Sequence, residues 1–505
     1  MNPEPSKTHT NNRRVSFELD HHRGNRHQRF SHGRNYSPPP NKRVHRQRAF
    51  SEGGDDSNSK TLLPNIVKDQ QPLNTGTSQQ QKIQLNESSI QAEPLSHYRK
   101  KRLEVQNAVN AESNLVLSAE LWSSNDTVFY LTVSCHLINE NWMQQSYVLD
   151  TAHLLTERTA EHVLQQLMRI SNEWNITDKI QVVVTNVDGI KKVDKSSCKW
   201  TFIPCFAHTL DKVWLETKRD SGLKPLFGKC QQIVAFFHQN IKASECLQKH
   251  RSHLKLQRNE LIQSIDLKWL PTLHMLQNIL ELWPAINKVF TERQADNPSL
   301  NESEIKLLKD IVEVLNILKE MTKKIGTKDH MAISNIIPLV QKLQVELRNL
   351  GMTGNTIAQT LSEKCDYHIG NIKQNIWFRV STALDPRHKT CLLCDSGVED
   401  VKTEIRTEIR GNTQTVHSSY ETSNTELILQ KYWKIKITED PLEFWKSRVE
   451  FEQLATIARK YLTVVSTAIP IERVHQLEQS QAINRRNWMD PKDLNMILFL
   501  NNNKL

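Results

Sequence analysis

The sequence predicts a mixed α/β domain combined with a large all-α region. Residues 115–149 hold short runs rich in β-branched and aromatic side chains, separated by polar turns. Residues 180–184 are apolar apart from Gln181, which is close to the pattern of a strand that is buried on both faces. From residue 205 almost to residue 350, apolar residues recur at a spacing of three to four, which indicates amphipathic helices.

Composition limits the class of protein. A chain of 505 residues with 24% charged residues has room for several domains and a full core. No apolar run approaches roughly 18 residues, so we expect no transmembrane helix and no membrane partner. The first residues lack the apolar stretch of a secretory signal. Eight scattered cysteines favour a reducing compartment. We also expect no small-molecule substrate.

The positive charge is concentrated near the start of the chain. The net charge is +10, and residues 1–60 alone hold 12 Lys and Arg against 6 Asp and Glu. An excess of this sign favours an anionic partner, nucleic acid first. Two basic clusters, residues 41–48 and 99–102, suit nuclear-import signals or nucleic-acid patches, and equally suit solvated charge runs. Residues 1–95 lack apolar spacing and are predicted to be disordered.

The elements of the α/β domain follow in order. Strands are expected at residues 115–119, at 127–135 and from 146, joined by turns that suit hairpins. A helix is expected over 159–170, because Val163, Leu164, Leu167 and Ile170 share one face, and the strand at 180–184 follows it.

The later part of the chain alternates ordered and polar segments. Pro271, Pro284 and Pro338 are expected to interrupt the helices. Residues 395–425, rich in Thr, Glu, Ser and Asn, are typical of a linker. Order restarts at Asp440, and Asp490 followed by Pro491 is a helix-start signal for a closing apolar helix.

Seven short motifs occur in order between residues 98 and 505. They are Glu120-Leu-Trp-Ser-Ser124, Val184-Thr-Asn186, Cys205-Phe-Ala-His-Thr-Leu210, Lys268-Trp269, Ala383-Leu-Asp-Pro-Arg387, Asp440-Pro-Leu-Glu-Phe-Trp445 and the segment from Ile469 to the closing helix. Each motif is weak alone. Together the series resembles the hAT superfamily of DNA transposases and the BED-type zinc finger (ZBED-like) proteins descended from them.

This resemblance implies a ribonuclease-H-like catalytic-type fold that is interrupted by a large all-α insertion. The implied parts are a disordered tail at 1–95, the first part of the ribonuclease-H-like domain at 96–205, the helical insertion at 206–395, a flexible linker at 396–438 and a C-terminal dimerisation region at 439–505. A BED finger needs two Cys and two His, and residues 1–114 contain no Cys, so no such finger is expected there.

Transposases of this family cleave DNA with two divalent ions held by three carboxylates. The resemblance puts the three positions at Glu120, Asn186 and Glu472. Glu120 is one methylene longer than the family's Asp, and the neutral amide of Asn186 cannot replace an anionic ligand that bridges two dications. Asp188 would have to move by roughly 6–7 Å to take its place. We therefore predict no transposase activity, no catalytic residues and no cofactor, with Mg²⁺ or Mn²⁺ used only if the enzyme is active.

Two further pairs resemble metal ligands. Cys205 and His208 match the family's Cys-x-x-His, and Cys391 and Cys394 are also three apart. Structural zinc takes four ligands, and neither pair has partners at the required spacing. The sequence therefore predicts no metal site, and core packing explains Cys205 and His208.

Two groups of residues are predicted to bind nucleic acid. Arg99, Lys100, Lys101 and Arg102 form the second basic cluster. Lys268 and Trp269 match the family's Arg-Trp, in which the indole can stack on a flipped base; a core position for Trp269 is the alternative.

The closing helix is predicted to mediate dimerisation through Leu494, Ile497, Leu498 and Leu500. Completion of the chain's own core is the alternative. The resulting hypothesis is an inactivated transposase-derived nuclear protein, a homodimer that binds DNA weakly or without sequence preference. An active or recently active transposase, and a decayed reading frame without a selected role, remain alternatives.

Overall fold

The structure is a computed structural model that describes residues 95–503 apart from eleven short gaps. The gaps are 126–127, 156–157, 194–197, 257–260, 263, 265–268, 294–297, 326–331, 413–418, 436–438 and 469–489. The chain divides into two units, Met1–Asn74 and Thr75–Leu505, and every described residue belongs to the second. The predicted disordered tail, the basic cluster at 41–48, Lys268 and Glu472 lie outside the described residues.

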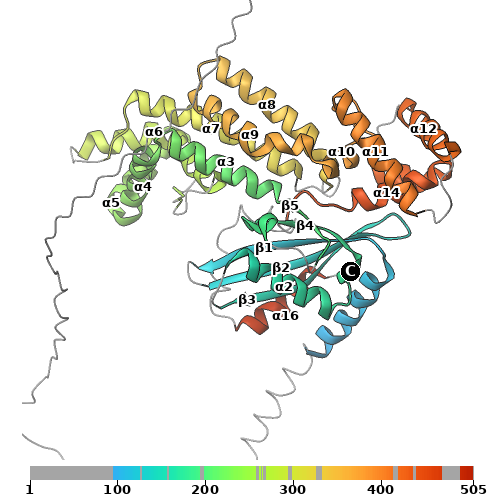
Figure 1. Ribbon diagram of the computed structural model, residues 1–505. Coiled ribbons are helices and arrows are strands. Elements are labelled where there is room, and N and C mark those ends of the chain that lie inside the picture. Colours follow the sequence, from blue (N-terminus) through green and yellow to red (C-terminus); the bar gives the residue numbers. More distant parts are fainter. Residues whose placement is uncertain are drawn as a thin grey trace, which may run out of the picture. The chain divides into compact units, whose positions relative to one another are not determined.

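A five-stranded mixed sheet forms the α/β part of this unit (Figure 1). Its strands are β1 (Leu115–Asn125), β2 (Val128–Ile138), β3 (Gln144–Leu154), β4 (Ile180–Thr185) and β5 (Thr201–Pro204), in the spatial order β3-β2-β1-β4-β5. The first three strands pair antiparallel, whereas β1 with β4 and β4 with β5 are parallel. The predicted strands are confirmed. Strand β5 was not predicted, because four residues are too few to show a periodic pattern.

The predicted helix is also confirmed as α2 (Ala160–Glu173). Thr159 caps its first turn by accepting a hydrogen bond from the backbone N–H of His162. The helix buries Val163, Leu164, Leu167 and Ile170, the residues whose spacing predicted it.

The sheet separates two apolar cores. In β4, Val182 and Val184 face a core built largely of helices, and Val183 faces the core on the opposite side. Burial on both faces explains why Val182, Val183 and Val184 are consecutive apolar residues. Helix α2 and a helix over residues 95–111 cover the Val183 side, to which Val105 and Val109 contribute.

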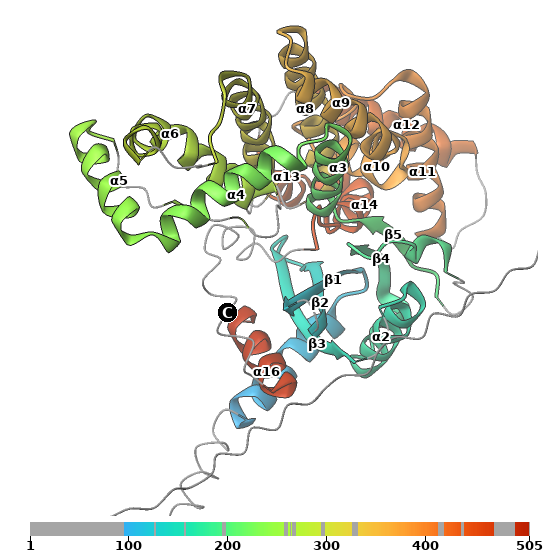
Figure 2. The same cartoon turned by 90° about the vertical axis from the view of Figure 1, so that its left-hand side faces the viewer.

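The other core belongs to the helices that follow β5 (Figure 2). These helices are α3 (Phe206–Asp220), α4 (Lys224–Gln239), α5 (Ile241–His253), α6 (Trp269–Arg293), α7 (Glu302–Ile325), α8 (Ile336–Met352) and α9 (Thr356–Ile369). Pro284 lies inside α6, so the prediction that it interrupts a helix is wrong. No helix among the described residues is long and apolar enough to cross a bilayer.

A third core corrects the predicted flexible linker at 396–438. It joins α10 (Ile376–Leu384), α11 (Asp395–Asn412), α12 (Ser419–Lys434), α13 (Pro441–Ser447) and α14 (Glu452–Leu462). Most of the expected linker is therefore helical. Val401, Ile405 and Ile409 recur every four residues on α11 and are buried, a narrow apolar stripe that the polar composition of the segment hides.

Candidate functional site

Glu120 lies on β1 in a row of polar side chains that crosses the sheet. Its register partner on β2 is Thr132, whose hydroxyl lies 3.2 Å from that of Thr151 on β3. The Glu120 side chain shares a face of β1 with Val116, on the side of the helical core, and Glu120 is 8% exposed. A carboxylate is therefore present at the predicted first position, within a largely buried polar environment.

Asn186 directly follows β4 and pairs with the backbone of Leu121, the residue after Glu120. Its Oδ1 accepts a hydrogen bond from the Leu121 N–H at 2.8 Å, and its Nδ2 donates to the Leu121 carbonyl at 2.8 Å. The last register pair of the parallel strands β1 and β4 is Ala119 and Thr185. The Asn186 side chain continues this pairing by one residue, with hydrogen bonds like those of a backbone amide. Both functions of the carboxamide are used, and a carboxylate, which only accepts, cannot form this pair.

Asp188, the considered substitute, is engaged elsewhere. Its side chain is 79% exposed and lies 3.2 Å from Lys212 Nζ on α3. The contact directs this carboxylate toward a surface lysine of the helical part.

The described chain comes back to this end of the sheet just before the gap that holds Glu472. The Cys205 N–H donates to the Thr185 carbonyl at 2.8 Å, and the Phe206 N–H donates to the Ser466 carbonyl at 3.0 Å. The Cys205 thiol accepts from the Ala468 N–H at 3.3 Å. Burial raises the pKa of Cys205 most, the hydrogen bond with Thr467 opposes this, and the charge of Glu120 raises it further. Residues 466–468 therefore lie over the ends of β4 and β5, on the Glu120 side.

Cys205 thus has a packing role. It is 1% exposed and part of the helical core. In the part of the chain that the structure describes, the one group of three or more side chains that could hold a metal is Cys246, His250 and Glu292. Sequence reasoning missed this group. The Cys-x-x-x-His spacing within one helix was the available signal, whereas Glu292 joins it only through the fold.

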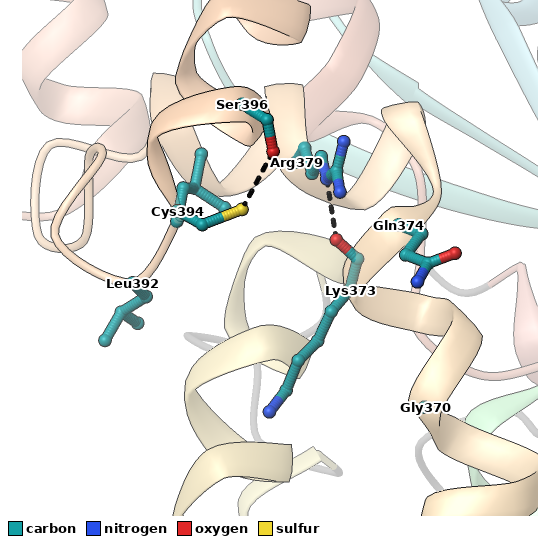
Figure 3. Close-up of a pocket in the computed structure, with 8 residues that line it drawn as sticks. Gly370, Lys373, Gln374, Arg379, Leu392, Cys394 and Ser396 are labelled. Carbon is teal, nitrogen blue, oxygen red and sulfur yellow. Dashed lines mark hydrogen bonds between the residues drawn. The ribbon is translucent and has the colours of Figure 1, made fainter. Parts of the chain in front are cut away.

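Cys391 and Cys394 are exposed, and Cys394 lines a surface cavity of about 590 Å³ (Figure 3). Hydrogen bonding to Ser396 is the main cause that lowers the pKa of the Cys394 thiol. The two cations of the lining are engaged in the protein: Lys373 Nζ donates to Gln344 at 2.8 Å, and the Arg379 guanidinium pairs with Asp400. The cavity therefore offers a single accessible thiol.

The basic cluster at 99–102 divides into two halves on the helix over residues 95–111. Lys101 pairs with Glu104 at 3.1 Å, and the Arg102 guanidinium lies 4.6 Å from the centre of the Trp174 ring. Arg99 and Lys100 are exposed. Only the latter two present their charge fully to a partner.

Trp269 requires a correction. It lies at the start of α6, is 5% exposed and belongs to the helical core. A base can stack only on an accessible ring, so the structure assigns this indole to packing. The apolar helix that follows Trp269 is the feature that favoured this alternative.

The predicted dimerisation residues require a second correction. Helix α16 (Pro491–Asn502) lies along β3, as both views show (Figures 1 and 2). Leu494 and Leu498 are 1% and 6% exposed and pack against Tyr130 of the same chain. Ile497 and Leu500 are half-buried. Leu500 packs against the core on the Val183 side of the sheet, so three of the four residues contribute to the chain's own fold.

Two asparagines fasten this helix segment to β3, an edge strand. Asn503 accepts from the Val148 N–H and donates to the Val148 carbonyl, both at 2.9 Å. Asn495 accepts from the Thr151 N–H at 2.9 Å and donates to Asp150. Edge strands expose unpaired peptide groups, and these side chains satisfy part of that edge.

Two family models match segments of this chain. Residues 118–200 match the ZBED1 RNase-like domain, and residues 424–504 match the hAT family C-terminal dimerisation region. The predicted resemblance to hAT transposases and ZBED-like proteins is confirmed. The two segments contain Glu120 and Asn186 in the first case, and Glu472 and α16 in the second.

Curated relatives agree at low identity. Human zinc finger BED domain-containing protein 4 is 22% identical over 315 residues, 59% of this chain and 27% of that protein. The putative AC transposase of Zea mays is 22% identical over 314 residues, 56% of this chain and 37% of the transposase. Human zinc finger BED domain-containing protein 6 is 21% identical over 260 residues, 48% of this chain and 26% of that protein. The matches therefore span less than two fifths of the length of these relatives.

Two of the hAT-like motifs meet inside the third core. The Trp445 indole donates to the Leu384 carbonyl at 2.8 Å. Asp385, fully buried, receives two hydrogen bonds from the Arg387 guanidinium, at 2.9 and 2.7 Å. These motif residues therefore hold the helices together.

Proposed function

We propose that this chain is a hAT-transposase-derived nuclear protein without two-metal nuclease activity, acting through DNA association, self-association or both. The RNase-like match and the strand order β3-β2-β1-β4-β5 support a ribonuclease-H-like scaffold as its frame. Glu120 and Asn186 directly follow the last β1–β4 register pair, Ala119 and Thr185, and we propose this as the place of the metal ligands in the ancestral scaffold.

The main support for the proposed loss of activity is the pair of hydrogen bonds between Asn186 and the Leu121 backbone, which we call the Asn186 clamp. A two-metal site needs an anionic oxygen between two dications. Here the side chain is neutral, and both its oxygen and its nitrogen are hydrogen-bonded to Leu121 at 2.8 Å. Releasing it for a metal would leave the Leu121 peptide unpaired at a half-buried position, at a cost of about 1–3 kcal/mol.

A cleavage assay tests this proposal. Purified protein is incubated with Mn²⁺ and hAT terminal-repeat DNA, and strand breaks are resolved on a denaturing gel. We expect no cleavage from the wild type. Metal-dependent cleavage that Glu472→Gln abolishes would instead identify an active transposase. The double variant Glu120→Asp with Asn186→Asp asks whether the longer side chain at 120 and the missing carboxylate at 186 are the only defects.

Self-association is proposed to use the C-terminal region without Leu494 and Leu498. Within residues 424–504, the exposed apolar side chains are those of Leu427 and Val449, and Ile497 on α16 is half-buried, among the residues that the structure describes. An interface that removes such side chains from water on two identical chains gains their burial twice.

Light scattering after size-exclusion chromatography tests the dimer. The wild type should elute as a dimer at tens of micromolar, and a Leu427→Asp, Val449→Asp double variant should be a folded monomer. Lys431→Asp is a matched control that changes charge on α12 without removing an apolar group. A monomeric wild type would exclude self-association at these concentrations.

DNA association is proposed to rest on the basic residues 1–94, outside the described residues, together with Arg99 and Lys100. Binding of this kind neutralises phosphates and weakens steeply with salt. Truncation should stop at residue 94, because the following helix packs Tyr98 against Phe499 and Arg102 against Trp174. In fluorescence anisotropy, the truncated chain should lose most salt-sensitive binding. Tight sequence-specific binding that survives truncation would contradict this assignment.

A further inference from the structure

We propose that Cys246, His250 and Glu292 form a transition-metal site, suited to Zn²⁺, that ties helix α5 to helix α6. Cys246 and His250 are four residues apart on α5 and so share one face of the helix. Glu292 lies in the last turn of α6. The ligand atoms of the three side chains all lie within 4.8 Å of one another.

The distances suit a tetrahedral ion. His250 Nε2 lies 2.9 Å from Glu292 Oε1, and Cys246 Sγ lies 3.4 Å from Glu292 Oε2. Zinc bonds of about 2.0–2.3 Å at tetrahedral angles separate nitrogen from oxygen by about 3.3 Å and sulfur from oxygen by about 3.5 Å. For these two pairs, inserting the ion requires side-chain shifts of a few tenths of an ångström. The third pair, Cys246 Sγ and His250 Nε2, lies within 4.8 Å and would have to reach about 3.6 Å.

The donor set selects the metal class. A thiolate with an imidazole favours zinc over magnesium or calcium, which prefer oxygen ligands alone. The thiolate and the carboxylate together balance the two charges of the ion. Binding forms a sulfur–metal bond and releases the Cys246 proton to solvent. Three protein ligands leave the fourth position to water, so this site is more open than a structural zinc site with four protein ligands.

Hydrogen bonds alone, without a metal, would give this group of side chains little stabilising effect. Without a metal, Glu292 accepts from both His250 and Cys246. The Glu292 side chain is 52% exposed, and surface pairs of this kind contribute little to stability. Burial first, and then the hydrogen bond and charge of Glu292, raise the pKa of Cys246. A dication reverses that last effect because it attracts the thiolate and the carboxylate together.

The position of the cluster gives the metal a structural purpose. Of the 13 residues of α5, only Ala243 and Leu247 are buried. The apolar contact that holds this helix is therefore small. Cys246 and Glu292 are 46 residues apart, so a shared metal would close a long loop and restrict the unfolded chain. We infer that the ion fixes α5 where packing is weakest.

Calorimetric titration of the chelator-treated full chain with ZnSO₄ tests the site. The wild type should bind one more equivalent than Cys246→Ala or His250→Ala, or bind at least roughly 100-fold more tightly at that site. His253→Ala and Glu245→Gln are matched controls, with the same residue types on α5 outside the cluster, and should retain wild-type binding. The exposed Cys391 and Cys394 are present in every sample, so their contribution cancels.

Cobalt substitution and thermal unfolding give independent readouts. Co²⁺ should produce a thiolate charge-transfer band in the wild type that Cys246→Ala lacks. Zn²⁺ should raise the melting temperature of the wild type and of His253→Ala, but not that of Glu292→Gln, which keeps the shape of the side chain. Equal zinc stoichiometry and affinity in the wild type and in Cys246→Ala, or no binding by the wild type, would overturn the proposal.

Discussion

Asn186 and Asn503 make the same contact in two regions with different roles. Each carboxamide pairs with one peptide unit, that of Leu121 at 2.8 Å and that of Val148 at 2.9 Å, respectively. Asn503 is 2% exposed and satisfies the edge of the sheet, whereas Asn186 is half-buried and lies where the hAT pattern has a metal ligand. The same two hydrogen bonds therefore close an edge in one region and, in the other, fix the side chain at the position that we propose has lost a metal ligand.

Disrupting the apolar contact of α16, the helix that precedes Asn503, should reduce the stability most. Leu498→Asp places a carboxylate in the apolar contact between α16 and Tyr130, where Leu498 is 6% exposed. We expect a loss of more than about 4 kcal/mol in the free energy of unfolding, with α16 detached. Denaturant unfolding followed by circular dichroism measures this loss. A stable, folded monomer would mean that Leu498 belongs to an intermolecular interface instead.

Acid should lower the stability of the sheet at strand β2, which lies between β1 and β3. His136 on β2 lies between Ser118 at 2.8 Å and Ser146 at 2.7 Å, and burial lowers its pKa to about 4. The unfolded state binds the proton first, so stability is complete above pH 6.5 and decreases as the pH falls toward 4. The decrease should reach at most about 3 kcal/mol. His136→Gln should flatten urea midpoints measured over this range; an unchanged slope would exclude His136 as its source.

Asn503→Asp tests the edge clamp directly. The carboxylate keeps the acceptor for the Val148 N–H but loses the donor and opposes the Val148 carbonyl. In this buried position we expect a loss of about 2 kcal/mol. Asn501→Asp, at an exposed position of the same helix, is the control. Equal unfolding midpoints for the two variants would show that the clamp adds no stability.

Asn186→Asp should have the smallest effect, about 1 kcal/mol, because the position is half-buried and water can solvate the new charge. Asp188→Asn, a change of the same type at a 79% exposed side chain, should stay within about 0.5 kcal/mol of the wild type. Calorimetric melting separates the two variants. If Asn186→Asp leaves the melting temperature unchanged, the hydrogen bonds to Leu121 do not stabilise the fold, and the comparison with Asn503 fails.

Local patterns predicted the α/β part of the fold well. β4 and α2 were recognised from Val182–Val184 and from the spacing of Val163 to Ile170, because burial on one or two faces leaves a direct trace in the sequence. The polar segment around α11 was misread, since three buried residues, Val401, Ile405 and Ile409, suffice to anchor a helix whose other faces are solvated.

The site was less predictable, because its contacts join distant residues. The neutral side chain of Asn186 is visible in the sequence, but its pairing with Leu121 depends on the β1–β4 register. Trp269 and Leu498 were assigned to partners because apolar character alone does not say which surface covers a residue. The group of Cys246, His250 and Glu292 could not be predicted, because it forms only when α5 and α6 pack side by side.

The return of α16 to β3 sets an order of events during synthesis. Strand β3 ends at Leu154, whereas the amide that closes its edge belongs to Asn503. For the whole interval between them, the nascent chain carries an uncovered strand edge, the kind of surface at which chains pair incorrectly. Contacts of such long sequence separation also form slowly. We therefore expect nascent chains halted before residue 490 to bind chaperones or aggregate, and full-length chains to be released from this state as α16 docks.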